Sequence, residues 1–172
     1  MTAPFRLQPF AEHDRTTFEC GEPALDGYFR TQVTQDIRRR LANCLVAIEG
    51  ATGAGAAYYT LSAASIPIND LPAELMKRLP RYPTIPAVRM GRLAVDQRFH
   101  GRGLGGALLA DAVHRALQAP AAAYALLVDA KNDKAVRFYE HHGFRAFSSA
   151  PMTLFLPLET ARKALSKFPA AP

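Results

Sequence analysis

Residues 98–109 of the chain read Arg98-Phe99-His100-Gly101-Arg102-Gly103-Leu104-Gly105-Gly106-Ala107-Leu108-Leu109. This stretch follows a strand-like run that ends at Asp96, and it opens an apolar pattern typical of a helix. Glycines at alternate positions let the backbone turn tightly because they have no Cβ. The first N–H groups of the helix face that turn, where the helix dipole also favours negative charge. The stretch therefore predicts a phosphate-binding loop over residues 101–106.

One candidate ligand for this loop is a dinucleotide. The pattern Gly101-x-Gly103-x-x-Gly106 matches a dinucleotide fingerprint, and Asp129 ends the next strand, where a ribose-binding acid belongs. Three features oppose this reading: a tail of residues 97–100 precedes the first glycine, the chain after Asp129 is short, and a hairpin precedes the loop. A P-loop is excluded because Gly-Lys-Ser/Thr does not occur in the sequence.

The second motif lies about thirty residues further on and reads Asn132-Asp133-Lys134-Ala135-Val136-Arg137-Phe138-Tyr139-Glu140-His141-His142-Gly143-Phe144. Seven residues separate Asn132 from Tyr139, so both lie on one face of a helix that Gly143 ends. The small Ala135 on that face allows a flat ligand to come close. Taken alone, the segment also fits an amphipathic helix in which Tyr139 is a half-buried packing residue.

Together the two motifs resemble those of the GNAT N-acetyltransferase superfamily. The family's phosphate signature, Gln/Arg-x-x-Gly-x-Gly/Ala, is matched by position over residues 100–105, where His100 replaces the usual Gln or Arg. A frame that starts at Arg98 matches literally, but it begins too early for the helix. The family pattern Asn-x-x-Ala-x-x-Phe-Tyr-Glu-x-x-Gly-Phe is matched without a gap over residues 132–144.

The resemblance implies that acetyl-CoA is the co-substrate, and the histidine spacing separately predicts no metal. It places the cofactor on the following residues: Leu93, Ala94, Val95, His100, Gly101, Arg102, Gly103, Leu104, Gly105, Gly106, Asn132, Ala135 and Phe138. Arg102 and the glycine loop would hold the pyrophosphate, and the strand end would lend backbone groups to the pantetheine arm. Tyr139 would protonate the leaving thiolate, and a phenol with a pKa near 10 suits that role. No residue stands out as a general base.

The chain resembles one branch of this superfamily over nearly its whole length, namely the acetyltransferase toxins of type II toxin–antitoxin systems. The segments that carry this likeness are 18–21, 25–26, 58–62, 79–83, 91–96 and 128–131. In that family the enzyme acetylates the α-amino group of aminoacyl-tRNA and stops translation. The resemblance also implies a ribbon-helix-helix antitoxin and a homodimer. The cysteines Cys20 and Cys44 have no close-spaced partner, and this fits a reduced protein in the cytoplasm. Acetylation of another amine (a small molecule, an antibiotic or a protein N-terminus) and a non-catalytic nucleotide-binding module remain the alternatives.

The net charge of +6 over 172 residues is concentrated in one segment. Seven basic residues lie between Lys77 and Arg102 against a single acid, Asp96. Such a cluster fits either a solvated surface or a polyanionic substrate. We expect Arg78, Arg81, Arg89 and Arg92 to contact tRNA, with a structural ion-pair role for Arg92 as the alternative.

Composition and periodicity indicate one α/β (α+β) domain over residues 1–172. Nearly half of the residues are hydrophobic, no segment is apolar enough to span a membrane, and the histidines lack zinc-ligand spacing. The resemblance implies a GNAT fold, with a single mixed, mostly antiparallel sheet of about six to seven strands flanked by helices. The predicted strands span residues 5–7, 43–49, 56–65, 87–95, 124–130, 144–147 and 152–157. The predicted helices span residues 22–40, 70–79, 104–117, 132–142 and 159–167.

Overall fold

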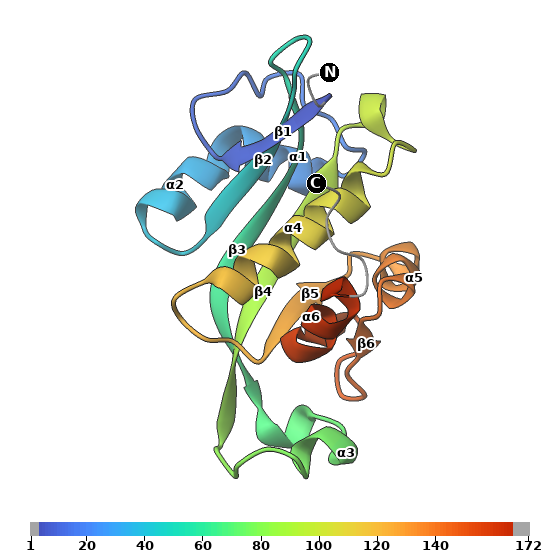
Figure 1. The fold of residues 1–172 in the computed structure, drawn as a ribbon. Coiled ribbons are helices and arrows are strands. Elements are labelled where there is room, and N and C mark those ends of the chain that lie inside the picture. Colours follow the sequence, from blue (N-terminus) through green and yellow to red (C-terminus); the bar gives the residue numbers. More distant parts are fainter. Residues whose placement is uncertain (1–3, 167–172) are drawn as a thin grey trace. The chain divides into compact units, whose positions relative to one another are not determined.

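The computed structural model describes residues 4–166, which form a mixed sheet with helices on it (Figure 1). The strands are β1 (Phe5–Pro9), β2 (Asn43–Glu49), β3 (Gly55–Pro67), β4 (Thr84–Val95), β5 (Ala125–Asp129), β6 (Arg145–Ala146) and β7 (Thr153–Pro157). They follow the order β1-β2-β3-β4-β5-β7-β6 in one seven-stranded sheet. The helices are α1 (Pro23–Gly27), α2 (Val33–Arg38), α3 (Ala73–Met76), α4 (Leu104–Gln118), α5 (Asp133–His141) and α6 (Leu158–Ser166). This architecture confirms the predicted fold class.

The chain divides into two compact units, which are described separately. Of the described residues, the first unit comprises 4–62 and 90–111, and the second comprises 63–89 and 112–166. The strands β3 and β4 and the helix α4 each contribute residues to both units. That residues 1–172 form one acetyltransferase domain stays a prediction.

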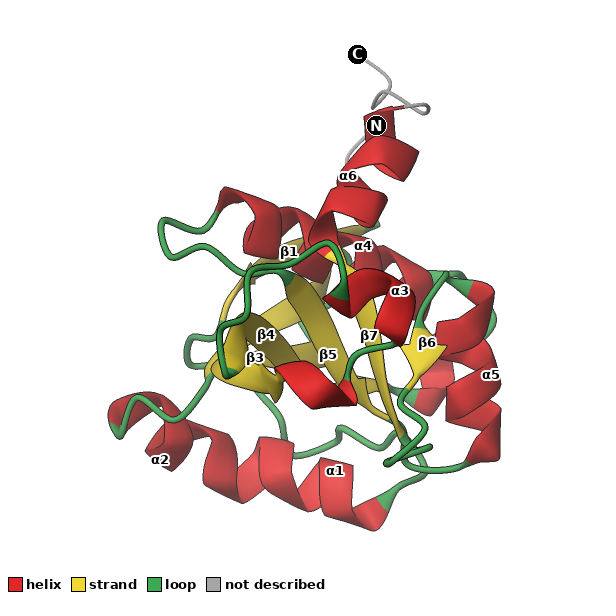
Figure 2. Cartoon of the chain, turned by 90° about the horizontal axis from the view of Figure 1, so that it is seen from below, coloured by secondary structure: helices red, strands yellow, loops and turns green. Residues whose placement is uncertain are grey.

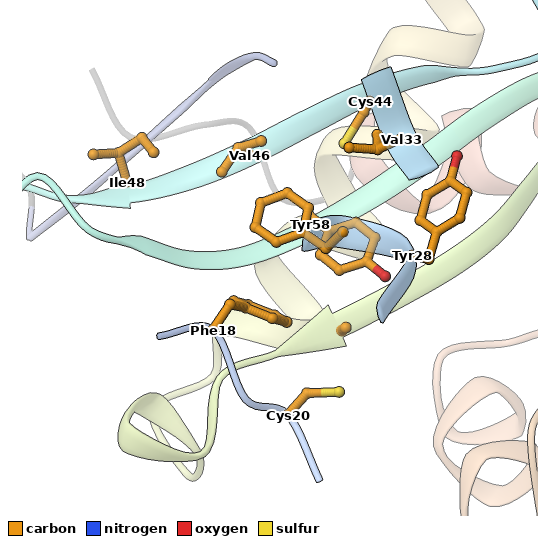
Figure 3. Close-up of a cluster of buried hydrophobic side chains, with 10 residues drawn as sticks. Phe18, Cys20, Tyr28, Val33, Cys44, Val46, Ile48 and Tyr58 are labelled. Atoms are coloured by element: carbon orange, nitrogen blue, oxygen red, sulfur yellow. The ribbon is translucent and has the colours of Figure 1, made fainter. Parts of the chain in front are cut away.

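The core of the first unit contains side chains from β2, β3 and the helical run 23–38 (Figure 3). Strand β2 pairs antiparallel with β1 and with β3, so the predicted hairpin is confirmed. The ring of Tyr58 stacks on that of Phe29, with ring centroids 4.3 Å apart. The Tyr58 hydroxyl donates a hydrogen bond to the carbonyl of Leu25, 2.7 Å away, so the polar tip of this buried ring is satisfied.

The second unit has its own apolar cluster, which includes Leu127 of β5 and Phe155 of β7. Strand β5 pairs antiparallel with β7, and β7 pairs antiparallel with β6 (Figure 2). The run 125–128 is buried at every position, so this strand is covered on both faces.

Some predicted boundaries were wrong for identifiable reasons. The predicted helix 22–40 is interrupted by a π-helical turn at Tyr28–Gln32, which separates α1 from α2. Strand β4 begins at Thr84 rather than at the predicted residue 87, since a proline is tolerated near the start of a strand. The predicted helix 70–79 shrinks to the single turn of α3. The predicted terminal helix starts one residue earlier, and Lys167 lies outside the described residues.

The described part of the chain offers no exposed cysteine, metal site or membrane-spanning helix. Cys20 and Cys44 are both buried and free of disulfides. Burial raises the pKa of the Cys44 thiol to about 12, so this thiol stays protonated and unreactive at neutral pH. Among residues 4–166, no group of three or more His, Cys, Asp or Glu side chains is arranged to hold a metal ion. No helix in the same range is long and apolar enough to cross a membrane.

Candidate active site

The glycine loop of the first unit adopts the predicted conformation. Gly101 and Gly103 have φ angles of +74° and +76°, in the left-handed region that side-chain-bearing residues avoid. A Cβ at either position would meet no atom within 4 Å, so backbone conformation, not lack of space, requires glycine. Helix α4 then begins at Leu104, as predicted.

The start of α4 leaves three backbone donors free of helical partners. The Ala107 N–H donates to the Gly103 carbonyl at 3.1 Å, which is the first hydrogen bond of the helix. By helix geometry the N–H groups of Leu104, Gly105 and Gly106 have no acceptor one turn back. These donors and the positive end of the helix dipole suit an anionic ligand.

Asp96 fixes the connection between β4 and the glycine loop. Its carboxylate is 1% exposed and caps a short 3₁₀ turn, Gln97–Phe99, by accepting the Arg98 N–H at 2.9 Å. The same carboxylate accepts the Glu19 N–H at 3.1 Å and two hydrogen bonds from the Arg98 guanidinium. Burial alone would raise the pKa of Asp96, but these hydrogen bonds outweigh burial and lower it. No local pattern in the sequence indicates this anchor, because Glu19 is 77 residues away from Asp96.

The three basic side chains of the loop have different surroundings. The Arg98 guanidinium is engaged by Asp96, with Nε 2.9 Å from Oδ1. His100 lies 2.7 Å from the Val95 carbonyl through Nε2, and since a carbonyl only accepts, Nε2 carries the proton. The Arg102 guanidinium lies over the rings of Phe5 and Phe99, at 5.0 and 5.7 Å from their centroids. Within residues 4–166 no carboxylate pairs with Arg102, so its charge is available to an anion.

The predicted pantetheine-binding residues occupy the end of β4. Ala94 is buried in the core of the first unit, whereas Leu93 and Val95 are half-buried. The Val95 carbonyl already accepts the hydrogen bond from His100. Because the methyl side chain of Ala94 is buried in this core, Ala94 can offer a ligand only its backbone groups.

In the second unit, Asn132 is the N-cap of α5 rather than its first helical residue. Its backbone is extended, and its Oδ1 accepts the Ala135 N–H at 2.9 Å. This cap satisfies one of the free donors of the helix N-terminus. This cap uses one lone pair of Oδ1, and the exposed amide N–H₂ of Asn132 can donate to a ligand.

The C-terminal end of α5 fixes the position of Tyr139. The Gly143 N–H donates to the Glu140 carbonyl and the Phe144 N–H to the Tyr139 carbonyl, which is a Schellman motif. Gly143 has φ +93°, and this confirms its predicted place just after the helix. The motif brings Phe144 against Tyr139, with ring centroids 5.6 Å apart. Phe138 is half-buried, and its ring contacts those of Tyr139 and His142.

Tyr139 combines a buried ring with a hydroxyl that makes no hydrogen bond within residues 4–166. The residue as a whole is only 5% exposed. Among the described residues, however, no fully buried side-chain oxygen lacks a hydrogen bond, so the Tyr139 hydroxyl, which makes none, must be in part accessible to solvent. Burial, aided by the negative charge of Asp129, raises the pKa of Tyr139 well above its usual range. The phenol therefore stays protonated at neutral pH, as a proton donor requires.

Asp129 has a structural partner that the sequence did not reveal. The Nη1 of Arg89 contacts both of its carboxylate oxygens, at 2.7 and 2.6 Å, and the Thr153 hydroxyl donates to it at 3.2 Å. Arg89 and Asp129 lie on β4 and β5, forty residues apart. Asp129 is thus engaged by Arg89 and Thr153 rather than free for a ribose.

The four arginines predicted to bind tRNA fall into two groups. Arg89 pairs with Asp129, and the Arg92 guanidinium lies 3.6 Å from the centroid of the Tyr28 ring in the first unit. Arg78 and Arg81 are exposed in the segment between α3 and β4. Among the described residues, no carboxylate forms an ion pair with either of them. Of the four arginines, Arg78 and Arg81 are therefore the two whose charge is not engaged by a carboxylate or an aromatic ring of the described residues.

The family is decided by comparison with known proteins. Residues 81–153 match the acetyltransferase (GNAT) domain. A tRNA-acetylating toxin of Mycobacterium tuberculosis is 34% identical over 151 residues, which cover 87% of this chain and 89% of the toxin. The chain belongs to the tRNA-acetylating toxin family of GNAT acetyltransferases. The probable toxin TacT of Sinorhizobium fredii is 32% identical and covers 87% of this chain and 88% of TacT.

Solved structures of GNAT toxins share the fold over nearly the whole chain. AtaT complexed with acetyl-methionyl-tRNAfMet is 27% identical, with a TM-score of 0.84 and coverage of 94% of this chain and 99% of AtaT. AtaTR bound with AcCoA is 26% identical, with a TM-score of 0.79 and coverage of 94% and 98%. The KacTA–DNA complex is 26% identical, with a TM-score of 0.77 and coverage of 95% and 99%. The predicted superfamily and toxin branch are confirmed.

Substitution of the loop glycines tests the conformational argument. We expect Gly101→Ala to lower the free energy of unfolding by about 1–2 kcal/mol, because alanine must adopt a left-handed φ, and to weaken acetyl-CoA binding. Gly27→Ala is the matched control: its Cβ also meets open space, but φ is −61°. Urea unfolding and calorimetric titration with acetyl-CoA measure both effects. Equal stability of the two variants would contradict the argument.

Proposed function

We propose that this toxin-family acetyltransferase transfers the acetyl group of acetyl-CoA to the α-amino group of aminoacyl-tRNA and thereby blocks translation. The observation that carries the chemistry is Tyr139, a protonated phenol whose ring is fixed by the end of α5 and whose hydroxyl reaches the surface. The tRNA-acetylating toxin of Mycobacterium tuberculosis supports the choice of substrate. The acetyl-methionyl-tRNA in the AtaT complex supports it independently.

The free N–H groups at the start of α4 and the unpaired guanidinium of Arg102 are proposed to bind the pyrophosphate of acetyl-CoA. Backbone groups of residues 93–95 would hold the pantetheine arm. The amide N–H₂ of Asn132 would donate a hydrogen bond to the cofactor, with Ala135 and Phe138 beside it. His100 would act indirectly, since its ring is bound to the Val95 carbonyl.

Tyr139 would give its proton to the thiolate that leaves when the amine nitrogen bonds to the acetyl carbon and the carbon–sulfur bond breaks. The nitrogen would release its extra proton to water, and the phenolate would take a proton back from water, so that the products are the N-acetyl group and free CoA. The amine must be neutral before it attacks. An α-amino group has a pKa of about 7.7–8.0, whereas a lysine side chain has one of about 10.4. A useful share of α-amines is therefore neutral at pH 7 without a general base, and the sequence offers no obvious base.

Incubation with labelled acetyl-CoA and total charged tRNA tests the proposed function. We expect the label on the aminoacyl end, released as an N-acetyl amino acid when the ester is hydrolysed. Label on a small molecule or a protein N-terminus, with none on tRNA, would favour another amine as substrate. Failure to release CoA with any amine would favour a non-catalytic module.

The salt dependence of tRNA binding tests the proposed basic face. Each lost phosphate contact should flatten the slope of log K against log salt by about 0.7–0.9. We expect this change for Arg78→Ala and Arg81→Ala. A smaller change is expected for Arg89→Ala and Arg92→Ala, because Asp129 neutralises Arg89 and Arg92 is held on Tyr28. Filter binding over a range of salt concentrations gives the slopes. Unchanged slopes in the first two variants would place the tRNA face elsewhere.

We further propose a ribbon-helix-helix antitoxin, a homodimer and a cytoplasmic site of action. The similarity to KacTA, whose complex contains DNA, supports a DNA-binding partner. The net charge of +6 favours an acidic antitoxin segment. Light scattering of the purified chain tests the dimer. Growth arrest on expression, relieved by co-expression of a neighbouring ribbon-helix-helix protein, tests the pairing.

A further inference from the structure

Tyr82 is an exposed aromatic side chain that the proposed chemistry does not use. It lies between α3 and β4 in the second unit, and its side chain is 60% exposed. Four large apolar residues of the described chain are exposed, and Tyr82 is the aromatic one among them; the others are Leu41, Met152 and Leu165. No other ring within residues 4–166 stacks on it. A large, flat π-surface is therefore open to solvent.

The segment that carries Tyr82 is well fixed. The Tyr82 N–H donates to the Pro80 carbonyl at 2.8 Å, and Pro80 and Pro83 restrict φ on either side of the turn. The Ile68 N–H donates to the Pro83 carbonyl at 3.1 Å. Leu79 packs against the apolar cluster of the second unit. Because the turn is already ordered, binding through Tyr82 costs little conformational entropy.

The surroundings of Tyr82 are basic. Lys77, Arg78 and Arg81 are all exposed within five residues of it. Glu74, the one acid of the adjoining helix α3, forms an ion pair with Arg145, in which Nη2 lies 2.7 Å from Oε1. An exposed aromatic ring among unpaired cations is the composition that binds single-stranded nucleic acid, in which bases stack on rings and phosphates meet cations.

We propose that Tyr82 stacks on an unpaired base at the 3′ acceptor end of the tRNA, with Arg78 and Arg81 on the flanking phosphates. The inference rests on the proposed function, because it takes charged tRNA as the substrate. The acceptor end is the single-stranded part of that substrate, and it carries the amino acid to be acetylated. Tyr82 is a binding residue for the acceptor end and takes no part in the transfer of the acetyl group.

The test compares Tyr82→Ala, Tyr82→Leu and Tyr82→Phe with the wild-type protein. Stacking on one base predicts that the alanine and leucine variants raise KM for charged tRNA about 5- to 100-fold, whereas phenylalanine retains most of the affinity. KM for acetyl-CoA should not change in any of them. Leu41→Ala is the matched control, since Leu41 is also 60% exposed but lies in the first unit.

A second readout is independent of catalysis. A tRNA with a fluorescent adenine analogue at an unpaired 3′ position should lose fluorescence when it binds the wild type or Tyr82→Phe. The loss should be absent with Tyr82→Ala and Tyr82→Leu. Normal KM and normal quenching in the alanine variant would overturn the inference. Conversion of a dimer to a monomer by Tyr82→Ala would also overturn it, by showing that Tyr82 contacts a second copy. If the wild type bound this tRNA with quenching but did not acetylate charged tRNA, the proposed function would fail while the stacking role stood.

Discussion

Replacement of Tyr139 by Phe is expected to lower the rate of acetyl transfer by about 10²–10⁴-fold and to leave acetyl-CoA binding unchanged. The substitution removes only the hydroxyl, which makes no hydrogen bond within residues 4–166, while the ring keeps its contacts with Phe138 and Phe144. The leaving thiolate would then have to take its proton from water. Fold and affinity should survive because neither depends on the lost oxygen.

Single-turnover measurements of acetyl transfer, with calorimetry for acetyl-CoA and thermal unfolding, separate these effects. Tyr124→Phe is the matched control, because Tyr124 is a second partly buried tyrosine of the same unit whose pKa is also raised by burial. It should retain normal activity. Near-normal turnover in Tyr139→Phe would reduce Tyr139 to a packing residue.

The same assignment constrains the pH dependence of the reaction. Burial and Asp129 raise the pKa of Tyr139 above the ordinary value near 10, so the phenol remains protonated throughout the neutral and mildly alkaline range. The rate should therefore rise as the substrate α-amine loses its proton near pH 8 and then stay level up to about pH 10. A decline of activity between pH 8 and 10 in wild type would argue against the phenol as the proton donor.

The parts of the site that the sequence predicted well are those that local chemistry determines. The positive φ of Gly101 and Gly103 follows from glycine's conformational freedom, and the start of α4 follows from the apolar pattern after the loop. The end of α5 at Gly143 follows from the Schellman motif. Each of these features depends on residues within a few positions of one another, so a linear pattern is enough to find it.

Contacts between residues distant in sequence were the parts that could not be predicted. Asp96 accepts a hydrogen bond from Glu19, 77 residues away, and Arg89 pairs with Asp129. Nothing near Asp96 or Asp129 in the sequence identifies these partners, because strand pairing and loop packing bring them together. For the same reason the sequence could not show that Arg89 has a carboxylate partner whereas Arg78, among the described residues, has none.

Replacement of Asp96 by Asn is expected to lower the free energy of unfolding by about 2–4 kcal/mol and to weaken acetyl-CoA binding. The carboxylate accepts hydrogen bonds from the Glu19 N–H, the Arg98 N–H and the Arg98 guanidinium, and every one of these partners is a donor. An amide N–H₂ in place of one oxygen would oppose donor to donor in a buried position. The connection from β4 to the glycine loop would lose its anchor, and the donors at the start of α4 would be less well ordered.

Urea unfolding and calorimetric titration with acetyl-CoA measure the two losses. Glu159→Gln is the control, because its ion pair with Arg162 is exposed and should contribute little to stability.

The pKa of Asp96 is lowered by folding, so its stabilising effect is present above the ordinary value near 3.9 and is lost as the pH falls through the lowered value. The stability difference between wild type and Asp96→Asn should accordingly be constant near neutrality and shrink below about pH 3.9. A difference that stayed the same down to the acid transition would mean that the negative charge of Asp96 does not contribute to holding the loop.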